Sequence, residues 1–495
     1  MIFELVISLL VSFLLGFFAI SLIWPRPFYG RATATFRCCL AFGFGSGISS
    51  VWFFWWLCLA AARGDYFYTF VLPELLITLG LGLSCFFFRR RRDLPIAHDQ
   101  RLQLECGGLF TRCLAAMFLT VVLSALVSFG LIARKNPHGE FDAVATWNLR
   151  ARFLARGSSH WRDAFAESPS LPHPDYPLLL PATIARSWKY IGGEPVMAPI
   201  SVAFFFTFSS VGLLCSSLAL LRNRQVGYLG GIVLLGVYPY VVLGASQYAD
   251  VATGFFMMSA IAILGLHDAW TNNENVRFLV LAGAAAGFCA WTKNEGLLFL
   301  SLLLAARFLF SIRRNGWRLC GREAAALGLG ILPVLAAVAY FKLGVAPANY
   351  YLKAGNYSTS GPMQYFLDPR TTGQKITDVS RYWLIAKSMA SEIVHLGGRT
   401  IGIVPLLLLY LFSARVRRKN VASVQTGIAV LVLMLAGYFF VYLTTPMNLE
   451  FHLRTSLSRL LLQLWPSAVF VFFMATSAAD PGTFKPYDLL AASES

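Results

Sequence analysis

The sequence predicts an all-α polytopic membrane protein with a single membrane domain spanning residues 1–495. Two observations support this fold class. Hydrophobic residues make up 57% of the chain and charged residues only 13%, about half the charged share of a typical soluble domain. Stretches of roughly 20 mainly apolar residues, the length needed to cross a bilayer, also recur from end to end. Lipid is therefore the expected surroundings of most of the chain.

Hydropathy predicts about thirteen transmembrane helices, joined by external loops that carry short helices beside the membrane. The eighth and ninth spans are short and share a polar hinge, so two crossings and one broken helix both remain open. The predicted spans lie near residues 2–24, 38–62, 67–88, 108–133, 196–221, 228–247, 251–269, 278–292, 296–312, 324–345, 400–414, 423–443 and 461–478.

Clusters of basic residues set the predicted orientation. RRRRD (89–93) follows the third span and RVRRKN (415–420) the eleventh, and further arginines follow the first, fifth and ninth. Short loops rich in Lys and Arg stay in the cytoplasm, so the N-terminus is expected outside and the C-terminus inside. These clusters explain much of the net charge of +17 through topology and contact with anionic membrane lipids. We therefore expect no nucleic-acid partner.

This topology leaves three substantial external segments, at residues 134–195, 346–399 and 444–460. In the first, FDAVATWNLRARFLARG (141–157) has an apolar stripe at helical spacing, which predicts a helix lying along the membrane surface. The alternative interpretation of this helix is an interfacial anchor. Asp142, at its start, is an acid beside anionic headgroups and therefore needs a partner or a function. The stripe consists of Val144, Trp147, Ala151 and Leu154.

The stretch LPHPDYPLLLP (171–181) contains four prolines. Proline fixes its own φ and disfavours helix in the residue before it. We therefore expect His173, Asp175 and Tyr176 to lie on a rigid, extended segment. The alternative is a proline-rich return to the membrane that only ends the surface helix.

Two further stretches place ionisable residues at the edge of the membrane. SQYADVATGFF (246–256) puts Asp250 at the outer end of the hairpin between spans six and seven, and WTKNEGLLF (291–299) puts Lys293 and Glu295 in the polar hinge. Ionisable residues at membrane depth are costly and are functional candidates. The alternative is an ion pair that stabilises the helix bundle.

The last external stretch, NLEFHLRTSLSRLLLQLWP (448–466), presents His452, Arg454 and Arg459 before the final span. Arginine donates bidentately to phosphate and stays charged, whereas the alternative is snorkelling to the interface. The tyrosine- and glycine-rich stretch at 349–370 suggests a mobile lid over the site.

Together these stretches resemble the GT-C superfamily of integral-membrane glycosyltransferases, in particular the protein mannosyltransferases of family 39 and the aminoarabinose transferases. Asp142 in FDA, HPDYPLLLP in place of an HPP.YP-like element, and Asp250 carry the resemblance. It covers roughly residues 135–470, so residues 1–107 are three extra N-terminal spans and residues 108–478 the GT-C-like core. Family enzymes usually pair two acids at the first site, whereas Ala143 follows Asp142. A divalent ion, Mg²⁺ or Mn²⁺, therefore stays open as a cofactor.

The resemblance implies transfer of a sugar from a polyprenyl-phosphate donor to a lipid, glycan or protein acceptor, by inverting displacement at the periplasmic face of a bacterial inner membrane. An O-antigen ligase or polymerase using diphosphate-linked glycans, and a transporter or flippase for lipid-linked sugars, remain alternatives. The implied roles are catalytic base for Asp142, acceptor or metal binding for Asp250 and Asp175, donor phosphate binding for Lys293, Arg454 and Arg459, and pocket wall for His173, Tyr176, Glu295 and His452.

Overall fold

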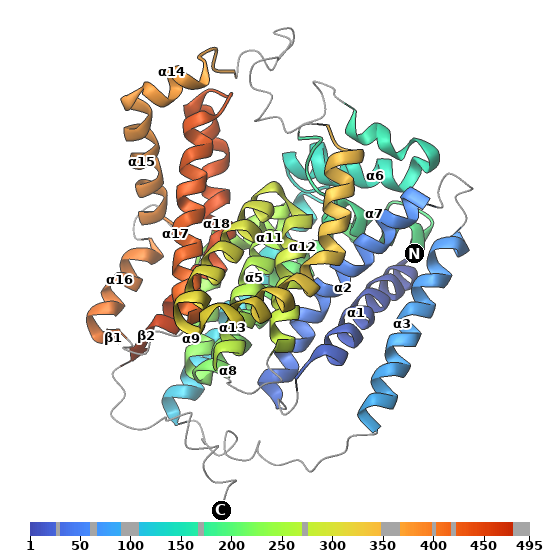
Figure 1. Cartoon of the computed structure of the whole chain (residues 1–495), viewed down its shortest axis with the longest axis horizontal. Helices are drawn as coiled ribbons and strands as arrows, with labels where there is room; N and C mark the ends of the chain where they lie inside the picture. The colour runs from blue at the N-terminus through green and yellow to red at the C-terminus, as the bar shows by residue number, and fades with distance from the viewer. Residues whose placement is uncertain are drawn as a thin grey trace, which may run out of the picture.

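A computed structural model describes residues 1–25, 30–59, 67–90, 108–166, 173–269, 276–347, 367–397, 402–416 and 422–478. Helices make up almost all of its regular structure (Figure 1). The elements in chain order are α1 (Ile2–Ile23), α2 (Arg31–Leu59), α3 (Phe67–Arg90), α5 (Leu109–Lys135), η2 (Ala143–Trp147), α6 (Asn148–Arg156), η3 (Ser158–Phe165), α7 (Leu179–Ile191), α8 (Met197–Leu221), α9 (Arg224–Gly236), α10 (Tyr238–Ala245), α11 (Ala249–Ala269), α12 (Val276–Thr292), α13 (Asn294–Gly344), α14 (Thr372–Thr377), α15 (Val379–Val394), α16 (Ile403–Ser413), β1 (Ala414–Val416), α17 (Ala422–Thr444), α18 (Leu449–Ala475) and β2 (Thr476–Ala478).

Within the described ranges, ten helices are long and apolar enough to cross a membrane, or eleven if α9 and α10 form one broken span. The protein is thus an all-α polytopic membrane protein, but the predicted count of thirteen spans is not confirmed. Three predicted spans account for the difference. α12 has 17 residues, α16 has 11, and α9 and α10 meet at 69°. The bend occurs at Val237, just before Pro239 in the first turn of α10.

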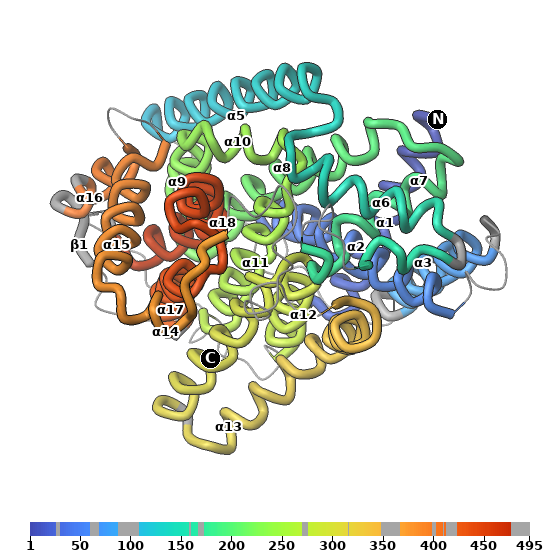
Figure 2. Tube along the Cα trace, turned by 90° about the horizontal axis from the view of Figure 1, so that it is seen from above, coloured from blue at the N-terminus to red at the C-terminus, as the bar shows by residue number. Residues whose placement is uncertain are grey.

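The bundle has a buried centre and a lipid-facing periphery. α11 packs against α8, α12 and α18. All of the residues in its apolar stretch are buried within the protein, whereas only 11% of those in α5 are buried. Figure 2 shows α11 inside the bundle and α5 along one edge. Asp250 lies in the first turn of α11 and Asp268 near its end, so this central helix carries one acid at each end.

The first two helices touch backbone to backbone. A Cβ added to Gly16 would lie 2.1 Å from the carbonyl oxygen of Ala41, and one added to Gly45 would lie 1.9 Å from that of Ser12. Side chains larger than hydrogen cannot fit at either position. α1 and α2 therefore pack at the short distance that small residues permit between membrane helices.

A buried ion pair holds α7 against the N-terminal helices. The Arg186 Nε atom lies 2.8 Å from Glu74 Oε1, and the Tyr190 hydroxyl donates to Glu74 Oε2 at 2.6 Å. Arg186 also donates to the Ser8 carbonyl oxygen at 3.0 Å. The side chains of Arg186 and Glu74 are each 1% exposed. α7 follows the HPDYP segment directly, so α1 and α3 hold the helix into which that segment leads.

Two local features complete the fold. Gly316, with φ of 75° and ψ of 173°, divides α13 into two helices, Asn294–Arg314 and Gly316–Gly344. β1 pairs antiparallel with β2 and joins the ends of α16 and α18.

Candidate active site

Asp142 and Asp250 are joined through one guanidinium group. The Arg459 Nη2 atom lies 2.6 Å from Asp142 Oδ2 and 3.4 Å from Asp250 Oδ2. Asp142 precedes η2, Asp250 begins α11 and Arg459 lies on α18. The structure thus brings together three candidates that are far apart in the sequence.

A second cation completes the cluster. The Lys293 Nζ atom lies 3.1 Å from Asp250 Oδ1 and 2.9 Å from Glu295 Oε1. Lys293 has extended backbone between α12 and α13, and the hinge predicted there is confirmed. Asp250 is 0% exposed and Lys293 2% exposed. Charges this deeply buried require partners, and each has them. Below, "the outer cluster" means Asp142, Asp250, Lys293, Glu295 and Arg459.

One backbone and one side-chain hydrogen bond hold the segment around Asp142 beside the turn that precedes Asp250. The Glu140 N–H donates to the Ser246 carbonyl oxygen at 3.2 Å, and the Asn148 amide donates to Gln247 Oε1 at 2.9 Å. Gly139 has a φ of 77°, and a Cβ there would lie 2.7 Å from the Ser246 oxygen. The approach of these loops therefore depends on glycine.

The predicted surface helix is present as η2 and α6. Three residues of its stripe, Trp147, Ala151 and Leu154, are buried within the protein, whereas Val144 is exposed. The Trp147 ring stacks on Tyr176, with ring centroids 5.6 Å apart. This helix is therefore a wall of the site, and Trp147 faces the protein interior rather than the headgroup region.

The HPDYP segment forms a turn, so the prediction of an extended segment is wrong. The Tyr176 N–H donates to the His173 carbonyl oxygen at 3.0 Å, and His173 has a φ of 51°. Pro174 disfavours the right-handed helical region for His173. His173 adopts the left-handed region instead, and this conformation closes the turn. The Arg150 guanidinium also donates to that carbonyl oxygen. Burial lowers the pKa of His173 to about 4, so its ring is neutral at pH 7.

Asp175 belongs to a neighbouring group of contacts. Its Oδ2 atom accepts from the Asn294 amide at 2.7 Å and lies 3.2 Å from Lys342 Nζ. Lys342 also donates to Asn294 Oδ1 at 2.6 Å. Asn294 stands in the chain between Lys293 and Glu295, so the two groups meet at the hinge. Tyr176 also connects them, because Lys293 Nζ lies 5.7 Å from the centroid of its ring.

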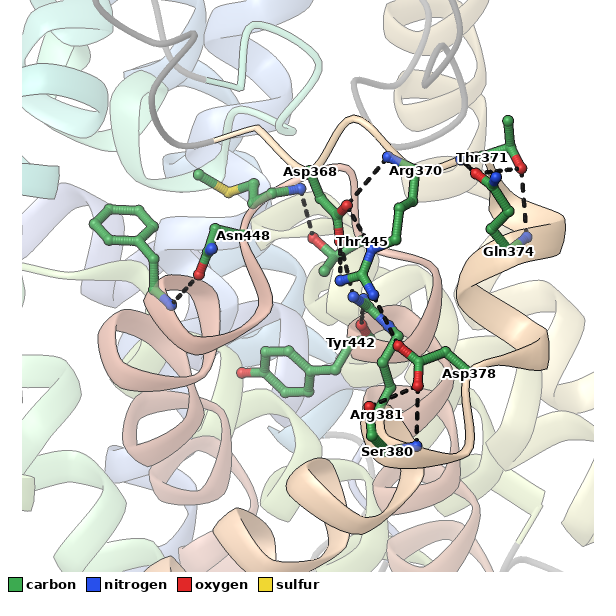
Figure 3. Close-up of polar contacts among 12 residues, drawn as sticks. Asp368, Arg370, Thr371, Gln374, Asp378, Ser380, Arg381, Tyr442, Thr445 and Asn448 are labelled. Carbon is green, nitrogen blue, oxygen red and sulfur yellow. Dashed lines mark hydrogen bonds and ion pairs between the residues drawn. The ribbon is translucent and has the colours of Figure 1, made fainter.

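The turn before α18 is held by contacts with residues 367–381 (Figure 3). The Asp368 N–H donates to the Pro446 carbonyl oxygen at 2.8 Å. Arg381 lies 2.8 Å from Asp368 Oδ2 and donates to the Tyr442 carbonyl oxygen at 3.1 Å. Arg370 also pairs with Asp368. These contacts fix the start of the helix that carries the bridging arginine.

The lid suggested at residues 349–370 lies almost wholly outside the described residues, which resume at residue 367.

The remaining candidates on α18 have different places. His452 Nδ1 lies 2.9 Å from the Thr445 hydroxyl, so this residue belongs to the turn before α18. Arg454 is exposed and forms no hydrogen bond or ion pair with a described residue. It precedes Arg459 by five positions, about 140° around an α-helix. The structure therefore does not bring Arg454 into the outer cluster.

The sequence analysis did not single out several neutral and basic residues that contact the acids of the site. The Gln463 amide donates to Asp250 Oδ1, one turn of α18 after Arg459. The Tyr248 hydroxyl accepts the Asp142 N–H at 3.4 Å, and Arg459 lies 4.6 Å from the centroid of the Tyr248 ring. Lys342 was detectable, because a lone lysine near the end of an apolar span is subject to the same argument as Lys293. Gln463 carries no charge and gave no comparable signal.

The charges of this region balance. Four carboxylates face four cations, and the latter are Arg150, Lys293, Lys342 and Arg459. Among the described residues, no three His, Cys, Asp or Glu side chains gather as a metal site. The group that joins Asp142 to Asp250 is the guanidinium of Arg459.

No protein-family model, curated protein or solved structure matches the chain. The fold and the site define a class, an all-α polytopic membrane protein with a cluster of acids and cations at one end of its central helix. The assignment of an activity therefore rests on the geometry and chemistry of that cluster.

Proposed function

We propose that the protein is a membrane glycosyltransferase that moves a sugar from a polyprenyl-phosphate donor to a hydroxyl or amine of a lipid, glycan or protein acceptor. The observation that supports this most is the bridge from Asp142 through Arg459 to Asp250. It places a carboxylate able to accept a proton beside a cation able to hold a phosphate.

The exposure of the side chains within the outer cluster supports a division of roles. The Asp142 and Arg459 side chains are 28% and 23% exposed, whereas that of Asp250 is 0%. Asp142 and Arg459 can therefore meet substrates directly. Asp250, with Lys293 and Gln463, holds Arg459 in place from the buried side.

The reaction follows from these positions. The acceptor oxygen or nitrogen attacks the anomeric carbon while the bond from that carbon to the phosphate oxygen breaks. The electron pair leaves with the polyprenyl phosphate, and Arg459 stabilises its charge. Asp142 takes the acceptor proton. Attack opposite the leaving group inverts the anomeric centre, as in the base-assisted step of inverting glycosidases.

Charge balance couples donor binding to activation of the base. Arg459 is paired with Asp142 before substrate arrives, so an incoming phosphate competes for the same N–H groups. Phosphate accepts strong, charge-assisted hydrogen bonds from arginine. Donor binding therefore releases the Asp142 carboxylate to receive a proton.

The proposed site faces the periplasm of a bacterial inner membrane. The alternating arginine clusters support this orientation through the preference of positive loops for the cytoplasm. The similarity of the FDA and HPDYP stretches to GT-C enzymes supports the same placement.

The mechanism proposed here uses no metal, because a guanidinium joins the two acids. Transfer by isolated membranes should then change less than about twofold on addition of EDTA. Loss of transfer with EDTA, restored by Mg²⁺ or Mn²⁺, would contradict this mechanism.

The decisive test replaces Asp142→Asn and measures sugar transfer by isolated membranes supplied with a polyprenyl-phosphate monosaccharide. General-base catalysis contributes about 10²–10⁴-fold, so we expect a loss of that size with unchanged membrane insertion. Glu140→Gln is the matched control, because that exposed acid pairs with Asn136 outside the cluster. Full transfer by Asp142→Asn would remove this residue from the mechanism.

A second variant tests the donor side. Arg459→Lys keeps the charge but loses the planar fork, so the KM for donor should rise more than the KM for acceptor. Activity with diphosphate-linked oligosaccharide alone would instead indicate a ligase or polymerase.

A further inference from the structure

A cavity lies at the opposite end of the bundle, in the bend of α13. It has a volume of about 370 Å³ and opens between the two helices that Gly316 separates. Arg307, which lines it, lies 2.8 Å from Asp268 Oδ1. Asp250 and Asp268 stand at the two ends of α11, about 27 Å apart along the helix. The cavity and the candidate active site are therefore separated by nearly the thickness of the hydrocarbon core.

The interior of the cavity suits a hydrocarbon chain. Its volume lies in the lower part of the range for ligand pockets. Arg307 is neutralised by Asp268 and by Glu323, whose Oε2 atom lies 2.9 Å from Arg307 Nε. The hydroxyl of Ser311 lines the cavity, is buried, and has no hydrogen-bond partner among the described residues. Most other lining residues are apolar, among them Leu304, Phe308, Leu327 and Ile331.

The rim of the cavity is basic and amphipathic. Four exposed arginines surround the bend, and none forms an ion pair with a residue in the described ranges. Trp317 is 72% exposed and packs edge-on against Phe308 of the lining. Tryptophan and arginine together are typical of the headgroup region. The four arginines are Arg313, Arg314, Arg318 and Arg322.

We propose that the α13 bend is a binding site for an anionic phospholipid, with one acyl chain in the cavity and the headgroup phosphate on the rim arginines. Basic pockets between membrane helices favour such headgroups. Charge complementarity selects an anionic lipid over a zwitterionic one, because Arg307 is already paired with two carboxylates and the excess positive charge lies on the rim. The site is independent of the proposed transferase activity.

The test measures the thermal unfolding of the purified full chain in detergent while phospholipid is added. Phosphatidylglycerol should raise the unfolding temperature saturably, as expected for a ligand that binds the folded state. Phosphatidylcholine and inorganic phosphate should not. An equal shift with phosphatidylcholine, or a shift with inorganic phosphate alone, would overturn the assignment.

Two glycines give a matched pair of variants. A Cβ at Gly328 or at Gly321 meets no atom within 4 Å, but only Gly328 lines the cavity. Gly328→Phe should fill the cavity and abolish the phosphatidylglycerol-dependent shift, whereas Gly321→Phe should keep it. A retained shift in Gly328→Phe would exclude the cavity as the site.

The role of the rim arginines is tested by removing their charge. Arg318→Gln with Arg322→Gln should raise the lipid concentration for half-maximal shift at least tenfold. Arg112→Gln with Arg224→Gln removes the same charge from other exposed positions and should leave it unchanged. Native mass spectrometry of the same variants counts retained phosphatidylglycerol directly. Equal retention by both double variants would overturn the rim assignment even if a variant were too unstable to melt cooperatively.

Discussion

The two ends of α11 carry the same residue type in different surroundings. Asp250 receives Lys293, Arg459 and Gln463 from two other parts of the chain. Asp268 receives Arg307, with His267 beside it in the chain. Asp250 thus joins the hinge at Lys293 to α18, whereas Asp268 belongs to a smaller group with His267, Arg307 and Glu323 on α11 and α13.

The difference teaches how a structural ion pair can be distinguished from a candidate site. Both acids are buried and both are neutralised. At the Asp250 end the network continues to Asp142 and Arg459, whose side chains are 28% and 23% exposed. At the Asp268 end the side chains of His267 and Glu323 are less exposed, at 16% and 12%. A network of charges that leads from a buried residue to one that water reaches is what the proposed transfer reaction would require.

The largest expected effect is that of Asp250→Asn. This change removes the carboxylate on which Lys293, Arg459 and Gln463 converge, and breaking a buried ion pair costs about 3–5 kcal/mol. Thermal unfolding in detergent, followed by intrinsic fluorescence, measures it. If Asp250→Asn proved no more destabilising than Asp268→Asn, the distinction between the two ends would be lost.

The next largest effect on stability is expected when the pH is lowered, through His173 beside the outer cluster. Burial holds the pKa of His173 at about 4, against about 6.5 in the unfolded chain. The unfolded state therefore binds more protons between these values, and stability falls as the pH drops from 6.5 toward 4. His173 should account for about 2 kcal/mol of this loss at pH 5. His173→Gln should reduce the slope of this part of the stability profile, and an unaltered slope would assign the acid sensitivity to other groups.

Asp268→Asn should have a smaller effect, about 1–2 kcal/mol. Arg307 keeps its contact with Glu323 in this variant, so its charge stays neutralised. Unfolding temperature and transfer activity measured on one preparation separate the two ends. A selective loss of transfer here would connect the inner end with catalysis.

The smallest effect is expected for Arg156→Gln. Arg156 pairs with Glu194, but its side chain is 67% exposed, and exposed ion pairs contribute little. The unfolding temperature should move by no more than about 1 °C. A larger shift would mean that burial is not what separates these pairs.

The membrane fold was predictable because apolar composition and span length are properties of the sequence. The number of spans was not, because hydropathy counts apolar residues and does not test whether a helix is continuous. The interruption at Val237 and the shortness of α16 depend on backbone geometry. Proline restraint likewise excluded helix at His173 without selecting between an extended segment and a turn.

The charged part of the site was predictable for a physical reason. Burying Asp250 or Lys293 beside lipid is costly, so their presence in the sequence marked a network. Tyr248 and Gln463 carry no such cost, and only the structure reveals them as partners. Arg454 and Arg459 look equivalent in the sequence, but their angular positions on α18 separate them.

The contact between α1 and α2 makes a distant part of the molecule sensitive to one methyl group. Gly45→Ala would push apart two helices that now touch, and Ser8 of α1 is a hydrogen-bond partner of Arg186 on α7. A defect more than a hundred residues upstream would thus reach the turn carrying His173. Inherited or engineered changes in this apolar N-terminal helix pair should accordingly be judged by what they do to the turn that carries His173.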